Sequence, residues 1–267
     1  MRTCTHNTHE MPAWNEPSSR FAENGGFCES QLYGSPPEYA NSFSCIVLLV
    51  LGCTGMMHSR GCHEFIVLTY AMFALNAIGS FMYHWTGQVG WAHVDEYSMT
   101  VAAVLPAYTI FEEMSVFYGF KFRTWSLTFA GWFMVLSFTI GALDLPGEIT
   151  SVFFAVPIAF LVACCLLATF NTKYVENENV TDEEKRMLVG GVCTALGSTV
   201  VWVVTETLCP TVPAMRYVYG HVIWHVGMPY GLYCVLMFIS TTRANEAGAT
   251  SRILYLSGKL PYAVVYN

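Results

Sequence analysis

Charged residues are scarce in this sequence. Asp, Glu, Lys and Arg together make up 12% of the 267 residues, whereas hydrophobic residues make up 54%. A soluble domain carries about 25% charged residues. Because only half of that share is present, few side chains can face water, and we expect lipid to surround most of the chain.

Two further features are missing. The net charge is −7, and no run of Lys and Arg exists that could bind the phosphates of a nucleic acid, so we expect no nucleic-acid partner. Residues 1–39 lack the apolar core of a secretory signal peptide. They are polar, rich in Asn, Ser, Glu and Pro, and are predicted to form a segment outside the membrane.

Long apolar runs are abundant. A transmembrane helix needs about 20 mostly apolar residues with few charges. Seven runs meet this requirement: Ala40–Met57, Phe65–His84, Val94–Tyr118, Trp125–Leu143, Val152–Phe170, Met187–Leu208 and Met215–Ile239. Only helices and closed barrels satisfy their backbone hydrogen bonds inside a bilayer. We therefore predict an all-α membrane protein, with a seven-transmembrane helix bundle at 40–240 and a tail at 241–267.

The connections between these spans alternate in positive charge. The first, third and fifth connections and the tail contain Lys or Arg, whereas the other three, Trp85–His93, Asp144–Ser151 and Cys209–Ala214, contain neither. The positive-inside rule then predicts a lumenal or extracellular N-terminus and a cytosolic C-terminus. Arg2, Arg20 and Arg216 are exceptions that do not overturn this pattern.

A few ionisable residues lie within or at the ends of the spans. Placing an ionisable side chain in the bilayer costs free energy, so such residues indicate a functional site. His84 closes the second span, Asp95 lies near the start of the third, and His221 and His225 lie near the start of the seventh. The predicted topology brings all four to the same membrane face. The spacing of four residues places the last two imidazoles on one helix face, about 6 Å apart.

Three histidines with one open coordination position are typical of a catalytic zinc site, in which the bound water becomes acidic. Asp95 would act as the general base, or would orient an imidazole or the water. Ser80 lies one turn before His84 and could donate a hydrogen bond to the oxyanion of a substrate. Alternatively, each histidine could simply bind a neighbouring helix. The common depth of all three histidines and Asp95 favours the metal site.

Four stretches resemble the alkaline ceramidase family. They are "FCESQLYGSPPEYANSFS", "GSFMYHWTGQVGWAHVDEYSM", "VVWVVTETLC" and "HVIWHVGMPYGLY", in the order in which the family carries them. The resemblance implies a seven-helix fold with zinc bound by His84, His221 and His225, and with Ser80 and Asp95 as the matching catalytic residues. It implies hydrolysis of ceramide, a sphingolipid substrate within the bilayer lipids, to sphingosine and a fatty acid. An endoplasmic reticulum or Golgi membrane is the implied location.

The resemblance also implies two features of the N-terminal segment. One is a disulfide between Cys28 and Cys209. The other is a calcium site, whose matching residues here are Glu29, Gln31 and Glu38. The family's Asp-Trp pair at this site is replaced by Gly26 and Phe27, and calcium favours about 6–8 oxygen ligands, so the loss of a carboxylate argues against calcium. In that case both glutamates are expected to cap a helix or to be solvated. Glu206 replaces an aspartate of the family.

Two other functions are compatible with seven helices and buried histidines. Progestin/adiponectin-type receptors share the wider fold and a related zinc site, but the orientation described for them is opposite to the one predicted here. A transporter or channel could instead relay protons through the histidines and Asp95 without a metal. A G-protein-coupled receptor is disfavoured, because no Asp-Arg-Tyr ends the third span.

Overall fold

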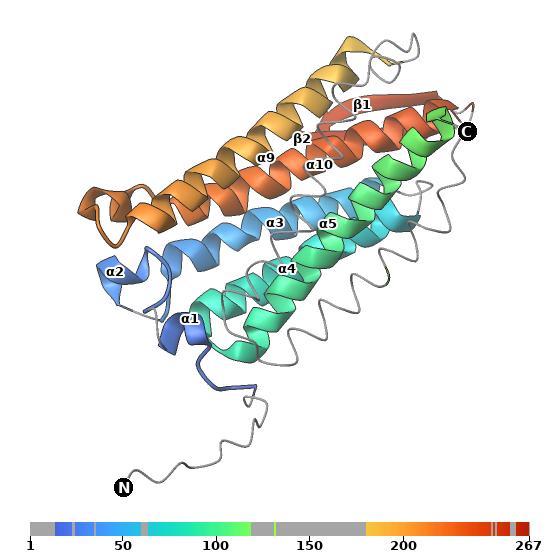
Figure 1. Cartoon of the computed structure of the whole chain (residues 1–267). Coiled ribbons are helices and arrows are strands. Elements are labelled where there is room, and N and C mark those ends of the chain that lie inside the picture. Colours follow the sequence, from blue (N-terminus) through green and yellow to red (C-terminus); the bar gives the residue numbers. More distant parts are fainter. Residues whose placement is uncertain are drawn as a thin grey trace, which may run out of the picture.

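The computed structural model describes residues 14–22, 25–34, 36–59, 64–118, 180–246, 250–256 and 260–266, with residues 131 and 248. The predicted spans Trp125–Leu143 and Val152–Phe170 lie outside the described residues. Five long helices form the described bundle and lie side by side (Figure 1). They are α3 (Tyr39–His58), α4 (Glu64–Thr86), α5 (Val89–Tyr118), α9 (Asp182–Leu208) and α10 (Gly220–Glu246).

Four of the described helices, α3, α4, α9 and α10, are long and apolar enough to cross a membrane. The prediction of a multi-pass helical membrane protein is therefore confirmed. The helix α5 has 30 residues but is not one of these four. It carries two pairs of adjacent carboxylates, Asp95 with Glu96 and Glu112 with Glu113, which lower its hydropathy.

Four helix boundaries differ from the predicted ones by about one to two turns. The helix α5 starts at Val89 instead of Val94, directly after a turn at Gly87 with φ +70°. The helix α9 starts at Asp182 instead of Met187, because Thr181 and Glu184 form a capping box that satisfies its first N–H groups. The segment before α10 is a separate 3-10 helix, η1 (Pro213–Tyr217), and α10 itself continues to Glu246.

The inner faces of the helices form one continuous apolar core. Tyr70 of α4 and Tyr233 of α10 are fully buried at its centre, with ring centroids 5.6 Å apart. The same face of α4 continues to Ser80 and His84, and α10 begins with His221 and His225, so the histidines lie beyond this core at one end of the bundle.

The C-terminal tail contains a β-hairpin that the all-α prediction misses. Its strands are β1 (Thr250–Leu256) and β2 (Leu260–Tyr266), paired antiparallel with Ile253 opposite Ala263. The Tyr233 hydroxyl donates a hydrogen bond to the Pro261 carbonyl at 2.7 Å. The hairpin lies at the opposite end of the bundle from the short helices α1 (Ser19–Ala22) and α2 (Ser30–Tyr33) of the N-terminal segment, residues 14–38 (Figure 1).

The helices α9 and α10 approach each other closely through small residues. A Cβ atom at Gly191 would lie 2.6 Å from the Gly231 carbonyl oxygen, so position 191 accepts no side chain without a shift of the backbone. Small residues of this kind allow close packing of membrane helices.

We expect Gly191→Ala to lower the thermal unfolding midpoint of the detergent-solubilised protein, because overpacking costs about 1–3 kcal/mol. The matched control is Gly190→Ala, one residue earlier, where no described atom lies within 4 Å of an added Cβ. There the better helix propensity of alanine should leave the midpoint equal or higher. Equal midpoints for the two variants would contradict the close approach.

Candidate metal centre

Three buried histidines meet at one end of the bundle. His84 comes from α4, and His221 and His225 come from successive turns of α10. One possible ligand atom from each residue lies within 4.8 Å of the other two. The ring centroid of His84 lies 4.9 Å from that of His221 and 5.1 Å from that of His225. The centroids of His221 and His225 are 4.5 Å apart. The structure thus brings His84 together with two histidines that lie 137 or more positions later in the chain (221 − 84 = 137).

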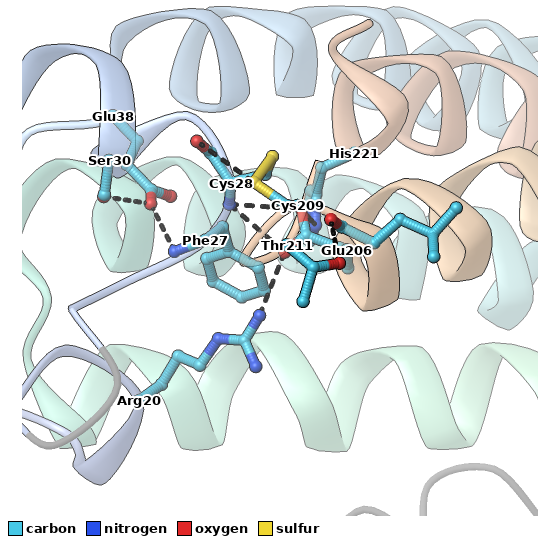
Figure 2. The surroundings of a disulfide bond; sticks show 10 residues. Arg20, Phe27, Cys28, Ser30, Glu38, Glu206, Cys209, Thr211 and His221 are labelled. Carbon is cyan, nitrogen blue, oxygen red and sulfur yellow. Dashed lines mark hydrogen bonds and ion pairs between the residues drawn. A yellow bond between two sulfur atoms is a disulfide. The ribbon is translucent and has the colours of Figure 1, made fainter. Parts of the chain in front are cut away.

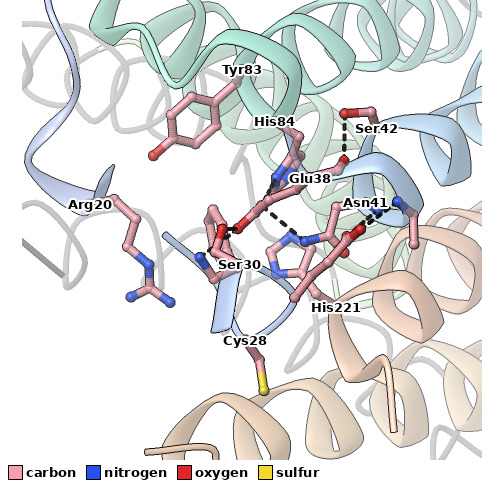
Figure 3. A network of polar contacts seen from close by, with 12 residues as sticks. Arg20, Cys28, Ser30, Glu38, Asn41, Ser42, Tyr83, His84 and His221 are labelled. Atoms are coloured by element: carbon pink, nitrogen blue, oxygen red, sulfur yellow. Dashed lines mark hydrogen bonds and ion pairs between the residues drawn. The ribbon is translucent and has the colours of Figure 1, made fainter. Parts of the chain in front are cut away.

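The His84 ring is oriented by Glu38, which precedes α3. Its Nδ1 lies 2.7 Å from Glu38 Oε2 (Figure 3). Burial raises the pKa of the Glu38 carboxyl, but the hydrogen bonds that it accepts, first of all from His84, outweigh burial and hold the pKa below its ordinary value. Glu38 is therefore a carboxylate that accepts the Nδ1 proton, which leaves the lone pair of His84 Nε2 to bind a metal.

The His225 ring is oriented by the first turn of α3. Its Nδ1 lies 3.2 Å from the Asn41 carbonyl oxygen and 2.8 Å from Ser44 Oγ. The Ser44 hydroxyl donates its own proton to the Asn41 carbonyl at 2.7 Å, so its oxygen can accept a proton from the imidazole. Both neighbours thus favour a proton on Nδ1, and Nε2 of His225 carries the lone pair.

The third imidazole, that of His221, has a carboxylate nearby but no hydrogen bond to it. Its Nδ1 lies 3.9 Å from Glu206 Oε1, which is beyond hydrogen-bonding distance. Aromatic rings surround it: the centroid of Phe27 is 4.3 Å away, and those of Trp202 and Trp224 are 5.6 and 5.7 Å away.

These residues fit a bound metal ion. His221 Nδ1 and His225 Nε2 are both buried, and neither has a hydrogen-bond partner among the described residues. A buried polar atom without a partner is costly, so the site is incomplete as a purely structural cluster. Imidazole ligands suit zinc, copper, iron and nickel. The triad could therefore hold a divalent metal.

Asp95 and Ser80 lie together beside the triad. Asn76 of α4 donates hydrogen bonds of 2.7 Å to both the carboxylate and the backbone carbonyl of Asp95. The buried Ser80 follows Gly79, where α4 approaches Asp95 so closely that an added Cβ would lie 2.8 Å from the Asp95 backbone nitrogen. On the neighbouring helix α3, the Cys45 sulfur lies 3.7 Å from His225 Nδ1.

A disulfide joins the N-terminal segment to the end of α9. Cys28 and Cys209 are bonded, and their Cα atoms are 5.9 Å apart (Figure 2). Beside it, the ring of Phe27 packs against His84 at 4.9 Å and against His221 at 4.3 Å. The N-terminal segment thus covers the histidines with an aromatic ring.

The residues that match the family's calcium ligands do not fit a calcium ion. The Glu29 oxygens accept the backbone N–H groups of Ala40 and Asn41 at 2.7 and 2.8 Å, so Glu29 caps α3. Both Glu38 oxygens also accept hydrogen bonds, from the donors Phe27 N–H, Ser30 Oγ, Asn41 Nδ2 and His84 Nδ1. Gln31 is exposed. Of the two alternatives expected for these acids, capping a helix holds for Glu29, and neither acid is solvated, since both are buried.

The position of the missing aspartate also lacks room for a ligand side chain. Gly26 has φ +88°, a backbone conformation that residues with side chains rarely adopt. A Cβ atom there would lie 2.9 Å from Glu38 Oε1 and closer still to Ser30 Oγ. No ligand side chain can therefore start from position 26 in this backbone.

Several residues that orient the site were not identified from the sequence. They are Asn41, Ser44, Cys45 and Asn76, and Glu38 in its contact with His84. Asn76 could have been found, because it stands four residues before Ser80 on an otherwise apolar helix face. Glu38 carried no such signal, because its partner is 46 residues away.

We expect Glu38→Gln to lower the affinity for a divalent metal about tenfold to a hundredfold, because removing the carboxylate partner of a ligating histidine has an effect of this size. Competition with a chelating dye would measure it. The control Glu29→Gln changes an acid of the same segment that caps α3 and does not contact a histidine. Equal losses in both variants would mean that Glu38 acts only through the fold.

Comparison with known proteins agrees with this geometry. A family model described as Ceramidase matches residues 24–264. A curated protein of Arabidopsis thaliana, described as alkaline ceramidase, is 27% identical over 225 residues, which cover 82% of each chain. The match to the family model takes in the N-terminal segment from residue 24, the histidine triad and most of the C-terminal hairpin. The chain therefore belongs to the alkaline ceramidase family.

Proposed function

We propose that this protein is a zinc-dependent amidase that hydrolyses ceramide to sphingosine and a free fatty acid within the membrane. The observation that carries the proposal is the buried triad of His84, His221 and His225, two of whose ring nitrogens have no hydrogen-bond partner among the described residues. Its occurrence in a chain of the ceramidase family supports an amide substrate.

Zinc is the metal that best fits this set of ligands. Three histidines leave one position of a tetrahedral ion open for water or substrate, as in catalytic zinc sites. Bound there, zinc would acidify a water to a pKa of about 7 and polarise the amide carbonyl. Two of the three rings are fixed by Glu38 and Asn41 with Nδ1 protonated, which directs their Nε2 lone pairs to the ion.

Asp95 and Ser80 supply the remaining chemistry. Asp95 takes the proton that water loses as its oxygen attacks the amide carbon, and returns it to the leaving nitrogen as the C–N bond breaks. The N–H group of Asn76 holds the carboxylate in place for both transfers. The Ser80 hydroxyl donates a hydrogen bond to the negative charge that develops on the carbonyl oxygen.

The proposed substrate and the helices of the protein both lie in the lipid bilayer. Ceramide stays in the bilayer, and four described helices are apolar enough to span it. We propose that the triad end faces the lumen of the endoplasmic reticulum or Golgi and that the C-terminus is cytosolic. The Cys28–Cys209 bond at the triad end supports this orientation, because disulfides persist in oxidising compartments.

Removal of the metal separates an amidase from a proton-relay transporter, which would work without it. We expect stripping with a strong chelator to abolish ceramide hydrolysis, and zinc to restore it. His225→Ala should lose both the bound metal and at least about a hundredfold in hydrolysis rate, because it deletes a ligand. The control His58→Ala, on α3 beside Tyr262 of the hairpin, should retain both. Full activity of the stripped protein would refute the zinc mechanism.

Asp95→Asn tests the general base. The amide keeps the shape of the side chain but cannot take a proton, so we expect kcat to fall by about 10²–10⁴ while the zinc content stays near that of the wild type. The control Glu96→Gln neutralises the adjacent carboxylate and should leave kcat nearly unchanged. A near-normal kcat in Asp95→Asn, measured with a fluorescent ceramide in detergent micelles, would remove Asp95 from the mechanism.

A further inference from the structure

Arg20 makes two contacts with its guanidinium group beside the triad. Its Nη2 lies 3.1 Å from Glu206 Oε2 on α9, and its Cζ lies 4.4 Å from the centroid of the Phe27 ring (Figure 2). Its backbone carbonyl also accepts a hydrogen bond from Gly26 N at 3.0 Å. A planar guanidinium can pair with a carboxylate and stack on an aromatic ring at once, which an ammonium group does less well.

Glu206 is the point at which three parts of the chain meet. Its Oε2 accepts hydrogen bonds from Arg20 and from the Cys28 N–H, each at 3.1 Å, and its Oε1 lies 3.9 Å from His221 Nδ1. The Glu206 side chain is 13% exposed, whereas that of Arg20 is 39% exposed. Removal of Arg20 would therefore leave a mostly buried carboxylate without its counter-charge, which is strongly unfavourable.

The contacts of Phe27 carry the effect of Arg20 to the histidines. Phe27 lies under the guanidinium on one side and packs against His84 and His221 on the other. Its backbone N–H donates to Glu38 Oε1 at 2.7 Å, and Glu38 in turn orients His84. Displacement of Phe27 would thus disturb the orienting partners of two of the three ligands.

The N-terminal segment, residues 14–38, contains a single positively charged side chain. Arg20 is the only Lys or Arg between positions 14 and 38. The two buried acids, Glu29 and Glu38, are already satisfied by N–H and O–H donors, and Gly26 has no room for a ligand side chain. The charge that fastens this segment to the rest of the bundle is therefore that of Arg20.

We propose that Arg20 is a positioning residue of the metal centre and that its contacts hold the N-terminal segment in place without a calcium ion. Its guanidinium holds Glu206 toward His221 and fixes Phe27 over the histidines, so that the site keeps its metal affinity without calcium. This inference rests on the proposed function, because it assumes that the triad binds zinc.

The test measures zinc affinity of the full-length protein in detergent, by competition with a chelating dye, and the visible absorption of the cobalt-substituted protein. Arg20→Gln should lower zinc affinity about tenfold and change the cobalt spectrum, because a partner that orients a ligating histidine is displaced. Arg20→Lys should fall between this variant and the wild type. The control Arg216→Gln removes the same charge from η1, where the described residues show no ion pair, and should have no effect.

A double variant shows whether Arg20 acts through Glu206. We expect Glu206→Gln to weaken zinc binding, and Arg20→Gln combined with Glu206→Gln to weaken it no further than the worse single change, because the two side chains act as one pair. Additive losses would overturn the inference, and so would wild-type zinc affinity and cobalt spectrum in Arg20→Gln.

A second experiment measures zinc affinity with and without calcium. The wild type should bind zinc equally well in millimolar calcium and in a calcium-specific chelator. A tenfold gain of zinc affinity on adding calcium would overturn the inference while leaving the amidase proposal intact. A wild-type protein that binds no zinc under any of these conditions would overturn both.

Discussion

Burial of three imidazoles in an apolar bundle is the constraint on which the rest of the structure depends. Away from water, each ring nitrogen needs a donor, an acceptor or a metal, because an unpartnered polar atom is costly there. Glu38 and Asn41 satisfy Nδ1 of His84 and His225. Nε2 of His225 remains buried and without a partner among the described residues. An ion shared by the rings would remove this cost.

The N-terminal segment exists in its folded form because several groups hold it to the bundle. The Cys28–Cys209 bond attaches it to the end of α9, and the Arg20–Glu206 pair lies one turn earlier on the same helix. Glu29 caps the first turn of α3, where Asn41 orients His225. The same short segment therefore fixes the entrance of α3, the cover of the site and the orientation of its ligands.

Local patterns of the sequence predicted most of the described helices, because lipid-facing helices need long apolar runs. They failed where the decisive partner is distant or polar. The cap at Thr181 extends α9 beyond its apolar part. The hairpin is stabilised by contacts with other elements, such as that of Tyr233 with Pro261, and the hydrophobic periodicity of a sequence does not predict such contacts. The three histidines could be identified from the sequence, because an imidazole within a membrane span costs free energy. Glu38, the partner that orients His84, could not be identified in this way, because it lies outside every span.

The arrangement of charge also fits a divalent ion. Glu38 lies 2.7 Å from His84, and Glu206 lies 3.9 Å from His221, so two carboxylates lie close to two different imidazoles. Their two negative charges match the charge of the ion, which would be costly in a medium of low dielectric without them. Arg20 offsets part of this charge at Glu206, whereas no Lys or Arg among the described residues pairs with Glu38. His84 therefore has the stronger anionic partner, and a chain with few charges concentrates several of them where a buried cation requires them.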